Sequence, residues 1–314
     1  MRFAFILDPL EGLKAYKDTS LAIMREAARR GHELHVALQH DVFLRHERVR
    51  LVTRPFEFAE GTAWYRAGTA AESAPAEFDA VLMRKDPPFD NEYLYSTYLL
   101  ELAAEQGACV LNHPASVRDW NEKLSVTRFA QFAPAFLVGS DEALIRAFLA
   151  EHGDIVVKPL DGMGGSGVFR LRLDDPNIGA ILETITDFGR RTIMAQRYLP
   201  QIKAGDKRII VIDGEPLPYA LARIPKAGET RGNLAAGGTG VAQPLSERDR
   251  EIAAAVGPVL KQKGLFLVGL DVIGDYLTEI NVTSPTGMVE IAAQTPCDPA
   301  RLFVDALERT CGAT

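Results

Sequence analysis

One segment of the chain, Lys158-Pro-Leu-Asp-Gly-Met-Gly-Gly-Ser-Gly167, has the composition of a phosphate-binding loop. It lies between two apolar, β-branched runs, so the pattern predicts two strands joined by a glycine-rich turn. Glycine lets the backbone approach an anion closely and point its N–H groups toward it. Lys158 adds a positive charge at the edge of the turn. The segment therefore predicts a site for a phosphorylated ligand, although an ordinary hairpin turn has the same local pattern.

Three of these glycines, Gly162, Gly164 and Gly167, also match the G-x-G-x-x-G fingerprint of dinucleotide-binding proteins. That fingerprint requires a helix after the loop, with the pyrophosphate at the helix N-terminus. The six residues after this loop instead alternate arginine with apolar side chains, which is typical of a strand. No Gly-Lys pair occurs in the chain, so the Walker A pattern is absent as well.

A second group of residues has the chemistry of a metal site. Asp271 lies in an apolar run at 267–273, and Glu279 and Asn281 lie in a run at 276–282, with a Gly274-Asp275 turn between the runs. Residues two apart on a strand face the same side, so Glu279 and Asn281 project together, and Asp271 can meet them across a hairpin. Carboxylate and amide oxygens suit Mg²⁺ shared with phosphates rather than zinc. The alternative is a solvated hairpin face.

The elements that must position these residues begin with alternating strands and helices. Asp18 is a candidate N-cap for a helix that ends before Gly31, and another helix is expected at 92–106. Strands are predicted at 3–7, 34–38, 79–83 and 108–112. This β-α-β order favours a parallel, doubly wound sheet. Residues 39–76 have no clear pattern.

The remaining elements predict a smaller α+β unit followed by a second sheet. A helix near 117–129 is expected to lead into this part. Further helices are predicted at 142–151, 178–188 and 247–263, and strands at 155–158, 168–173, 208–213 and 217–222. A polar, glycine-rich span at 225–240 is too long for a simple turn, and such loops are commonly functional lids.

Composition narrows the class of protein. The 314 residues carry a net charge of −7 with a pI near 5.5, which argues against a nucleic-acid-binding protein but allows a local basic pocket. The three cysteines, Cys109, Cys297 and Cys311, are odd in number and lack metal-ligand spacing, so a reducing compartment without a disulfide framework is expected. No signal peptide or membrane-spanning run is predicted.

Taken together, these motifs resemble those of ATP-grasp carboxylate–amine ligases, and among them the bacterial glutathione synthetase family. The resemblance extends over most of the chain, excluding residues 39–76 and the end beyond about residue 291. It is carried by these blocks, in order: Met83-Arg-Lys-Asp-Pro-Pro-Phe-Asp90, Asn121-Glu-Lys123, Lys158-Pro-Leu-Asp-Gly-Met-Gly-Gly165, Gly205-Asp-Lys-Arg208, Leu221-Ala-Arg-Ile-Pro225, Glu229-Thr-Arg-Gly-Asn-Leu-Ala-Ala-Gly-Gly238, Val268-Gly-Leu-Asp271 and Leu277-Thr-Glu-Ile-Asn-Val-Thr-Ser-Pro285.

The resemblance implies an α/β protein with an ATP-grasp fold and an N-terminal doubly wound parallel-sheet domain. The implied domains are 1–120, an α+β lid at 121–197, and a C-terminal domain at 198–314 that carries the metal ligands and a flap at 224–240. It also implies a homo-oligomer, with a tetramer as the first candidate, no nucleic-acid or membrane partner, and a cytoplasmic location.

The implied reaction joins γ-glutamylcysteine to glycine, with ATP as co-substrate, through an acylphosphate, and yields glutathione, ADP and phosphate. Such a reaction needs positioning and charge neutralisation rather than a protein nucleophile. By this resemblance, ATP is bound by Lys123, Lys158, Gly164, Gly165, Gln196, Tyr198, Leu199 and Asp206. Taken alone, Lys123 has the pattern of a solvated helix lysine, and Tyr198 and Leu199 that of core residues.

The resemblance further assigns the metal, the catalytic groups and the peptide site. Asp271, Glu279 and Asn281 hold two Mg²⁺, for which Mn²⁺ is a possible substitute. Arg208 and Arg223 act on the transferring phosphoryl group, Arg223 foremost. The substrate-binding residues are Arg84, Arg231, Asn233, Ser284 and Pro285.

The flap at 224–240 has an expected purpose, because acylphosphates hydrolyse readily and a lid can exclude water before glycine attacks. Shortening this loop is expected to leave ATP binding intact and to raise ATP hydrolysis that is not coupled to ligation. The ratio of ADP to glutathione formed measures this, and an unchanged ratio in the shortened variant contradicts the assigned role.

Two alternatives remain at the level of sequence. Another ATP-grasp ligase, such as a D-alanine–D-alanine or glutamate-adding enzyme, would share the ATP and metal residues; the Arg-Lys-Asp-Pro-Pro-Phe-Asp block and the Glu-Thr-Arg-Gly-Asn-Leu block favour glutathione synthetase. A non-catalytic ATP-binding protein of the same fold would be indicated by loss of a metal ligand or of Arg223, and all of these residues are present.

Overall fold

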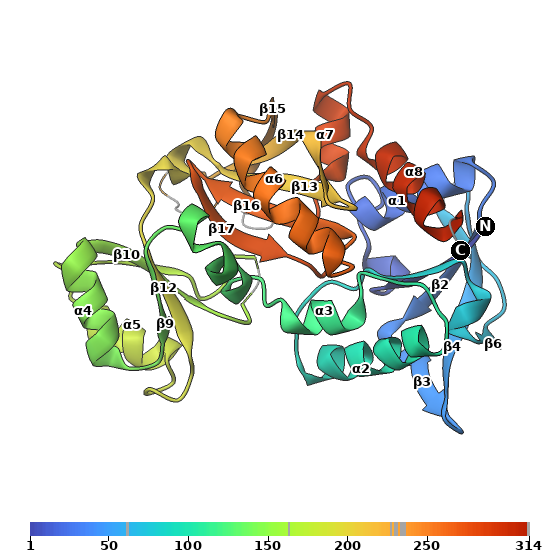
Figure 1. Cartoon of the computed structure of the whole chain (residues 1–314), viewed down its shortest axis with the longest axis horizontal. Coiled ribbons are helices and arrows are strands. Elements are labelled where there is room, and N and C mark those ends of the chain that lie inside the picture. Colours follow the sequence, from blue (N-terminus) through green and yellow to red (C-terminus); the bar gives the residue numbers. More distant parts are fainter. Residues whose placement is uncertain (61–62, 163, 227, 229–231, 233–236, 313–314) are drawn as a thin grey trace.

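The computed structural model of the chain describes residues 1–60, 63–162, 164–226, 228, 232 and 237–312. Three sheets follow one another along the sequence, with eight, four and five strands (Figure 1). The α/β class and the doubly wound N-terminal sheet predicted from the sequence are both present. Among the described residues, no helix combines the length and apolar character needed to cross a bilayer.

The first sheet is built around four parallel strands, in the order β2-β1-β7-β8. Their bounds are β1 Arg2–Leu7, β2 Glu33–Leu38, β7 Ala80–Met83 and β8 Val110–Leu111. Helices α1 (Thr19–Arg29) and α2 (Asn91–Glu105) connect them, and Asp18 caps α1 by accepting the N–H of Leu21. Phe3 to Ile6 are completely buried, as expected for a central parallel strand.

Residues 39–76, which have no clear secondary-structure pattern in the sequence, add antiparallel strands to this sheet. These are β3 Val42–Arg45, β4 Arg48–Phe58, β5 Tyr65–Ala67 and β6 Ala71–Ser73. The long strand β4 pairs with β2, β3, β5 and β6. This part of the chain therefore widens the N-terminal sheet away from the remaining two sheets.

The second sheet is a small antiparallel unit with helices on one face (Figure 1). Its strands are β9 Phe136–Gly139, β10 Asp154–Pro159, β11 Phe169–Arg172 and β12 Ile193–Arg197, in the order β11-β10-β12-β9. Helices α4 (Glu142–His152) and α5 (Ile178–Ile185) bury a core against it that includes Ile145, Ile155 and Leu182. Because β11 follows the glycine loop as a strand, the dinucleotide fingerprint is excluded, as predicted.

The helix predicted near 117–129 is interrupted. Helix α3 (Pro114–Asp119) ends early, and a 3₁₀ segment, η4 (Leu124–Phe132), follows it. The Asn121 side chain accepts the backbone N–H groups of Lys123 and Leu124, at 3.0 Å each. This local side-chain-to-backbone bonding competes with helical bonding and fixes a turn between the two segments.

The third sheet contains the predicted metal hairpin. Its strands are β13 Asp206–Ile212, β14 Glu215–Ile224, β15 Thr239–Pro244, β16 Leu267–Ile273 and β17 Tyr276–Asn281, all antiparallel. The register places Asp271 opposite Glu279 on one side and opposite Arg208 on the other, and Asp206 opposite Arg223. Helix α6 (Glu247–Gln262) packs on this sheet. Helix α7 (Met288–Gln294) comes after β17 in the chain.

The last helix, α8 (Pro299–Gly312), returns to the N-terminal sheet, so the two chain termini lie near one another (Figure 1). It packs beside α1, and Phe303 forms an edge-on ring contact with Phe266. Arg30 bonds Asp305 and Glu308 of α8 at 2.7 and 2.8 Å. Glu26 of α1 holds the same arginine in place at 2.8 Å.

Replacing Glu26 with glutamine is expected to lower the free energy of unfolding by about 1–2 kcal/mol at pH 7, because a buried charge-assisted pair is lost. A hydrogen bond from Arg29, opposed by burial and aided by Arg30, lowers the pKa of Glu26 to about 2. Since the folded-state pKa is depressed, the contribution is full above the unfolded pKa, near 4.5, and is lost as the pH falls toward 2. Urea unfolding of both proteins at pH 7 and pH 3.5 should show the difference shrinking in acid; a constant difference contradicts this account.

Candidate active site

A cavity of about 500 Å³ lies where the three sheets meet. The four-stranded sheet contributes Lys158 and Gln196, the five-stranded sheet contributes Arg208, Arg223 and Glu279, and the loop before α1 contributes its polar residues. The predicted residues that line the cavity are Lys123, Lys158, Gly164, Gly165, Gln196, Tyr198, Leu199, Asp206, Arg208, Arg223, Glu279, Asn281, Ser284 and Pro285. These fourteen predicted residues thus share one cavity, whereas Asp271 and Arg84 are not among its lining residues.

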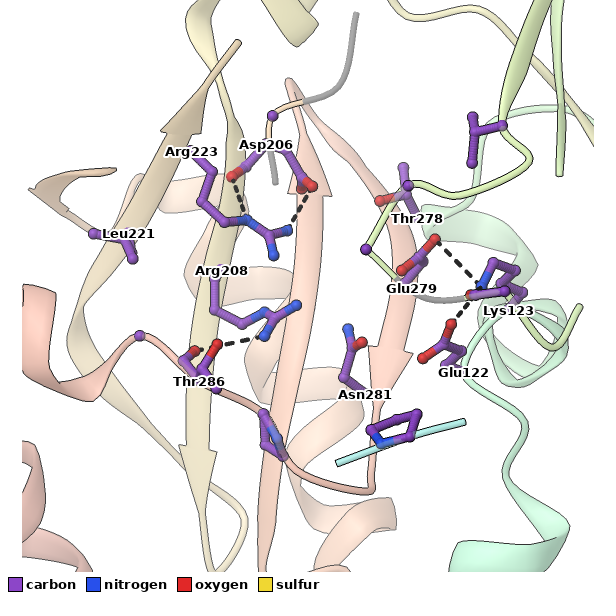
Figure 2. A pocket seen from close by; sticks show the side chains of 18 of the residues that line it. Glu122, Lys123, Asp206, Arg208, Leu221, Arg223, Thr278, Glu279, Asn281 and Thr286 are labelled. Carbon is purple, nitrogen blue, oxygen red and sulfur yellow. Dashed lines mark hydrogen bonds and ion pairs between the residues drawn. The ribbon is translucent and has the colours of Figure 1, made fainter. Parts of the chain in front are cut away.

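Two buried arginines of the cavity wall, Arg208 and Arg223 (Figure 2), share one buried carboxylate, that of Asp271. Arg208 bonds Asp271 through Nη2 at 2.9 Å, and Arg223 bonds the same carboxylate at 2.8 Å. Arg223 also bonds Asp206, its cross-strand neighbour. Asp271 is 2 % exposed and does not itself line the cavity. The arginines therefore lie between Asp271 and the cavity.

Two lysines and two further carboxylates form a second charged group, of which Figure 2 labels Lys123, Glu122 and Glu279. Lys158 donates to Glu279 at 3.2 Å, and Lys123 lies 4.0 Å from the same carboxylate. Lys123 also donates to Glu122 and, at 2.7 Å, to the carbonyl of Gly162 at the start of the glycine loop. Sequence reasoning assigned no role to Glu122, although it lies inside the Asn121-Glu-Lys123 block.

The ionisation states follow from these pairings. Burial opposes ionisation of Asp271, but the Arg208 and Arg223 guanidinium groups outweigh it and lower the pKa of Asp271. Burial likewise opposes ionisation of Glu279, and Lys123 and Lys158 outweigh it, so the pKa of Glu279 is also lowered. For Asp206, burial dominates over the attraction of Arg223 and raises the pKa to about 7.

The glycine loop has the backbone that its sequence predicts. Gly164, Gly165 and Gly167 have φ of 63°, 79° and 69°, a region that other L-residues rarely adopt. A Cβ on Gly162 would lie 2.7 Å from Cγ of Pro159. The loop therefore needs glycine at these positions, and Gly164 and Gly165 present their backbone to the cavity.

The four-stranded sheet and the residues just after β12 present a buried polar group and two large side chains to the cavity. Gln196 is 4 % exposed, lines the cavity, and its Nε2 is buried with no hydrogen-bond partner among the described residues. A buried amide donor without a partner is costly unless a ligand accepts from it. Leu199 is buried, and the Tyr198 ring lies 3.6 Å from the guanidinium carbon of Arg170.

The opposite wall joins the N-terminal sheet to the loop that follows β17. Arg84 donates to Ser20 and to the carbonyl of Pro285, both at 3.0 Å, and Ser284 donates to the carbonyl of Arg84 at 3.1 Å. Arg84 is 5 % exposed, lies behind the cavity lining, and its Nη1 has no partner among the described residues. Asp86, two residues on, does line the cavity, and burial raises its pKa.

The cavity lining includes residues to which the sequence assigned no part in the site. The polar segment before α1 contributes Lys14, Lys17 and Asp18, which carry no motif. Thr278, between Leu277 and Glu279 in a quoted block, donates to the carbonyl of Asp271 at 3.1 Å. Two residues assigned to substrate, Arg231 and Asn233, lie outside the described residues, as do positions 227, 229–230 and 234–236 of the predicted flap.

The chemistry of the donor set fits a divalent cation. Asp271, Glu279 and Asn281 offer hard oxygen ligands on adjacent strands, and the ligands that Mg²⁺ prefers are of this kind. Among the described residues, no three His, Cys, Asp or Glu side chains converge into a preformed metal cluster. Both carboxylates are held by the cations described above, so a metal must compete with arginine and lysine for them.

Comparison with known proteins identifies the family. A family model described as the prokaryotic glutathione synthetase N-terminal domain matches residues 1–118, and one described as the prokaryotic glutathione synthetase ATP-grasp domain matches residues 122–296. The fold resembles solved ATP-grasp structures: D-cycloserine synthetase DcsG (TM-score 0.69, 17 % identity, 99 % of this chain and 100 % of that one) and a RimK domain protein from Sphaerobacter thermophilus (TM-score 0.63, 19 %, 98 % and 99 %). The fold and site thus define an ATP-grasp ligase.

Relatives with much higher sequence identity narrow the family within the ATP-grasp ligases. Glutathione synthetase of Nitrosomonas europaea is 60 % identical over 313 residues, covering 98 % of each chain. The protein of the same name from Bordetella parapertussis is 57 % identical, covering 99 % of this chain and 100 % of that one, and that from Salmonella typhi is 52 % identical, covering 98 % of each. The chain belongs to the prokaryotic glutathione synthetase family. It is an ATP-dependent ligase of glutathione biosynthesis that uses ATP with a divalent metal.

Proposed function

We propose that the chain ligates γ-glutamylcysteine to glycine, with ATP phosphorylating the cysteinyl carboxylate first and the glycine amine displacing phosphate from the acylphosphate. The observation that carries this proposal is the pair Arg208 and Arg223 beside a glycine loop with two lysines, all on one cavity. Charge develops on phosphoryl oxygens during transfer, and fixed guanidinium and ammonium groups stabilise it without reorganisation.

The nucleotide is proposed to lie between the two C-terminal sheets. Lys123 and Lys158 turn from Glu122 and Glu279 toward the phosphates, and Gly164 and Gly165 donate backbone N–H groups. Gln196 donates Nε2 to the edge of the adenine ring, while Tyr198 and Leu199 pack against its faces. Asp206, whose Oδ1 has no hydrogen-bond partner among the described residues, accepts from the ribose.

The metal is proposed to be two Mg²⁺, with Mn²⁺ as a substitute, held by Asp271, Glu279 and Asn281. When bound, it neutralises phosphate charge and orients the phosphates for in-line transfer. The chain's own part is to supply the oxygens from a rigid hairpin. Arg208 and Arg223, once they leave Asp271, have two fork-shaped donor groups for the carboxylate and the phosphoryl group.

The peptide is proposed to occupy the wall formed with the N-terminal sheet. Ser284 and Pro285 line this wall, and Arg84 fixes it through the carbonyl of Pro285. A direct bond from Arg84 to a substrate carboxylate requires its guanidinium to become exposed. Arg231 and Asn233 are assigned to the substrate side of the flap, 224–240.

The division into domains, the location and the oligomeric state are also part of this proposal. Domains of 1–120, 121–197 and 198–314 agree with the succession of the three sheets. The protein is proposed to be cytoplasmic and to form a homo-oligomer, with a tetramer as the first candidate. Size-exclusion chromatography with light scattering tests the oligomeric state.

ADP release by the purified protein, with Mg²⁺, tests the reaction. We expect release only when γ-glutamylcysteine and glycine are both present, with one glutathione formed per ADP. A matched series replaces γ-glutamylcysteine with glutamine or glycine with D-alanine, each expected to be inactive. Turnover with another carboxylate–amine pair but not with this one would overturn the substrates and leave the ATP-grasp ligase class intact.

A further inference from the structure

Two thiols meet where the C-terminal helix returns to the N-terminal sheet. Cys311 lies in the last turn of α8, and Cys109 directly precedes strand β8. Both are thiols, and a hydrogen bond between the two side chains lowers the pKa of Cys109 and raises that of Cys311. The two sulfurs are therefore in contact, although the residues are far apart in sequence.

Rigid elements hold both partners. The carbonyl of Cys109 accepts the N–H of Val81 at 2.8 Å, which ties it to the centre of the parallel sheet. On the other side, the ion pairs of Arg30 with Asp305 and Glu308 fix α8 against α1. Cys311 belongs to the same buried cluster as Phe303 and Leu307, and Cys109 packs against that cluster. The thiol contact is thus a feature of the fold rather than of a loop.

The two thiols differ in accessibility. Cys109 is half-buried, whereas Cys311 is buried, at 9 % exposure. Of the two thiols, that of Cys109 is therefore the one that a dissolved disulfide reaches first. The hydrogen bond with Cys311, opposed by burial, lowers the pKa of Cys109 to about 7, which favours the reactive thiolate form. Burial raises the pKa of Cys297, which makes the third thiol the less reactive control.

We propose that Cys109 and Cys311 form a dithiol site that undergoes thiol–disulfide exchange with glutathione disulfide, the oxidised form of the product of this family. The Cys109 thiolate attacks one sulfur of glutathione disulfide, which breaks the S–S bond and releases one glutathione thiolate. The Cys311 thiol gives its proton to solvent and attacks the Cys109 sulfur of the mixed disulfide, releasing the second glutathione. Two protein thiols are oxidised and one glutathione disulfide is reduced to two glutathione thiols, so electrons balance.

The resulting bond fixes the C-terminal helix to the N-terminal sheet. Neither cysteine lines the cavity, so ligation is expected to continue at an unchanged kcat. The bond closes a loop of about 200 residues, and long loops give the greatest restriction of the unfolded chain, so the midpoint of thermal unfolding is expected to rise by roughly 5 °C. This assigns the pair a function that the sequence did not indicate.

The experiment exposes the full-length reduced protein to glutathione and glutathione disulfide at a series of ratios, followed by alkylation and peptide mapping by mass spectrometry. We expect a cross-linked peptide pair containing Cys109 and Cys311, with Cys297 alkylated throughout. In Cys311→Ser, Cys109 should be trapped as a mixed disulfide with glutathione, and Cys109→Ser should show no cross-link. Cys297→Ser is the matched control and should cross-link as the wild type does.

Absence of the cross-link in both the wild type and Cys297→Ser at every ratio overturns the proposal, and so does preferential modification of Cys297. The wild type and Cys297→Ser therefore test the proposal even if Cys311→Ser fails to fold. An unchanged melting midpoint in the cross-linked protein refutes the restraint on α8. Because glutathione disulfide is supplied, the exchange is measured without turnover, so its failure is distinguishable from failure of the proposed ligation.

Discussion

Replacing Arg223 with alanine is expected to lower the kcat of glutathione formation by about 10³-fold, because one fixed donor to the developing phosphoryl charge is lost. The dissociation constant for a non-hydrolysable ATP analogue should stay within about threefold, since the lysines and the glycine loop remain. Steady-state kinetics and isothermal titration separate the two quantities. Arg223 is buried and bonded to Asp206 and Asp271, so circular dichroism must first show that the variant is folded.

Two further variants make this prediction specific. Arg223→Lys keeps the charge but cannot bond two carboxylates with a planar fork, so most of the loss in kcat should persist. Arg190→Ala removes an exposed arginine paired with Asp187 and should behave as the wild type. A folded Arg223→Ala protein with normal kcat would remove Arg223 from the catalytic machinery.

Replacing Asp271 with asparagine is expected to lower the free energy of unfolding by about 3–5 kcal/mol, because two buried guanidinium groups lose the carboxylate that they share. The same change should abolish metal-dependent turnover, since Asp271 is also a proposed ligand. Urea unfolding measures the first effect, and nucleotide titration with and without Mg²⁺ measures the second.

The matched control for this prediction lies on the same hairpin. Asp275 occupies the exposed turn four residues on, and Asp275→Asn makes the same chemical change without burial. Its stability and metal dependence should match those of the wild type. Equal effects of the two substitutions would show that the paired, buried position of Asp271 is not the cause.

Much of the fold could be predicted, because its hydrophobic periods agree with its final elements. The strands at the N-terminus, the glycine hairpin and the β16–β17 hairpin are all present, and the register puts Asp271 opposite Glu279 as inferred. The long strand β4 went unrecognised because arginines occupy several of its positions and Pro55 lies within it, although its residues 49–53 alternate in burial. The prediction of a continuous helix near 117–129 was wrong because a single side chain, that of Asn121, accepts hydrogen bonds from two backbone N–H groups.

The candidate site could be predicted in its residue types but not in its internal pairing. Oxygen ligands at strand spacing indicated a metal, and glycines indicated phosphate. That Arg208 and Arg223 hold Asp271, while Lys158 holds Glu279, depends on the register of strands distant in sequence. The polar residues before α1 join the cavity only through tertiary packing, so no local pattern could identify them.

The pairing of every proposed metal carboxylate with a proposed phosphate-binding cation has a consequence for how ligands enter and leave. The nucleotide needs the cations that now hold the carboxylates, and the metal needs the carboxylates that now hold the cations. Binding of one ligand therefore frees groups that the other requires, so the two binding events are thermodynamically linked, and each raises the affinity for the other by the same factor. Divalent metal by itself should leave the site in its resting arrangement. After turnover, the internal ion pairs re-form as ADP and phosphate depart, which gives product release its own driving force and returns the site to its internally paired arrangement.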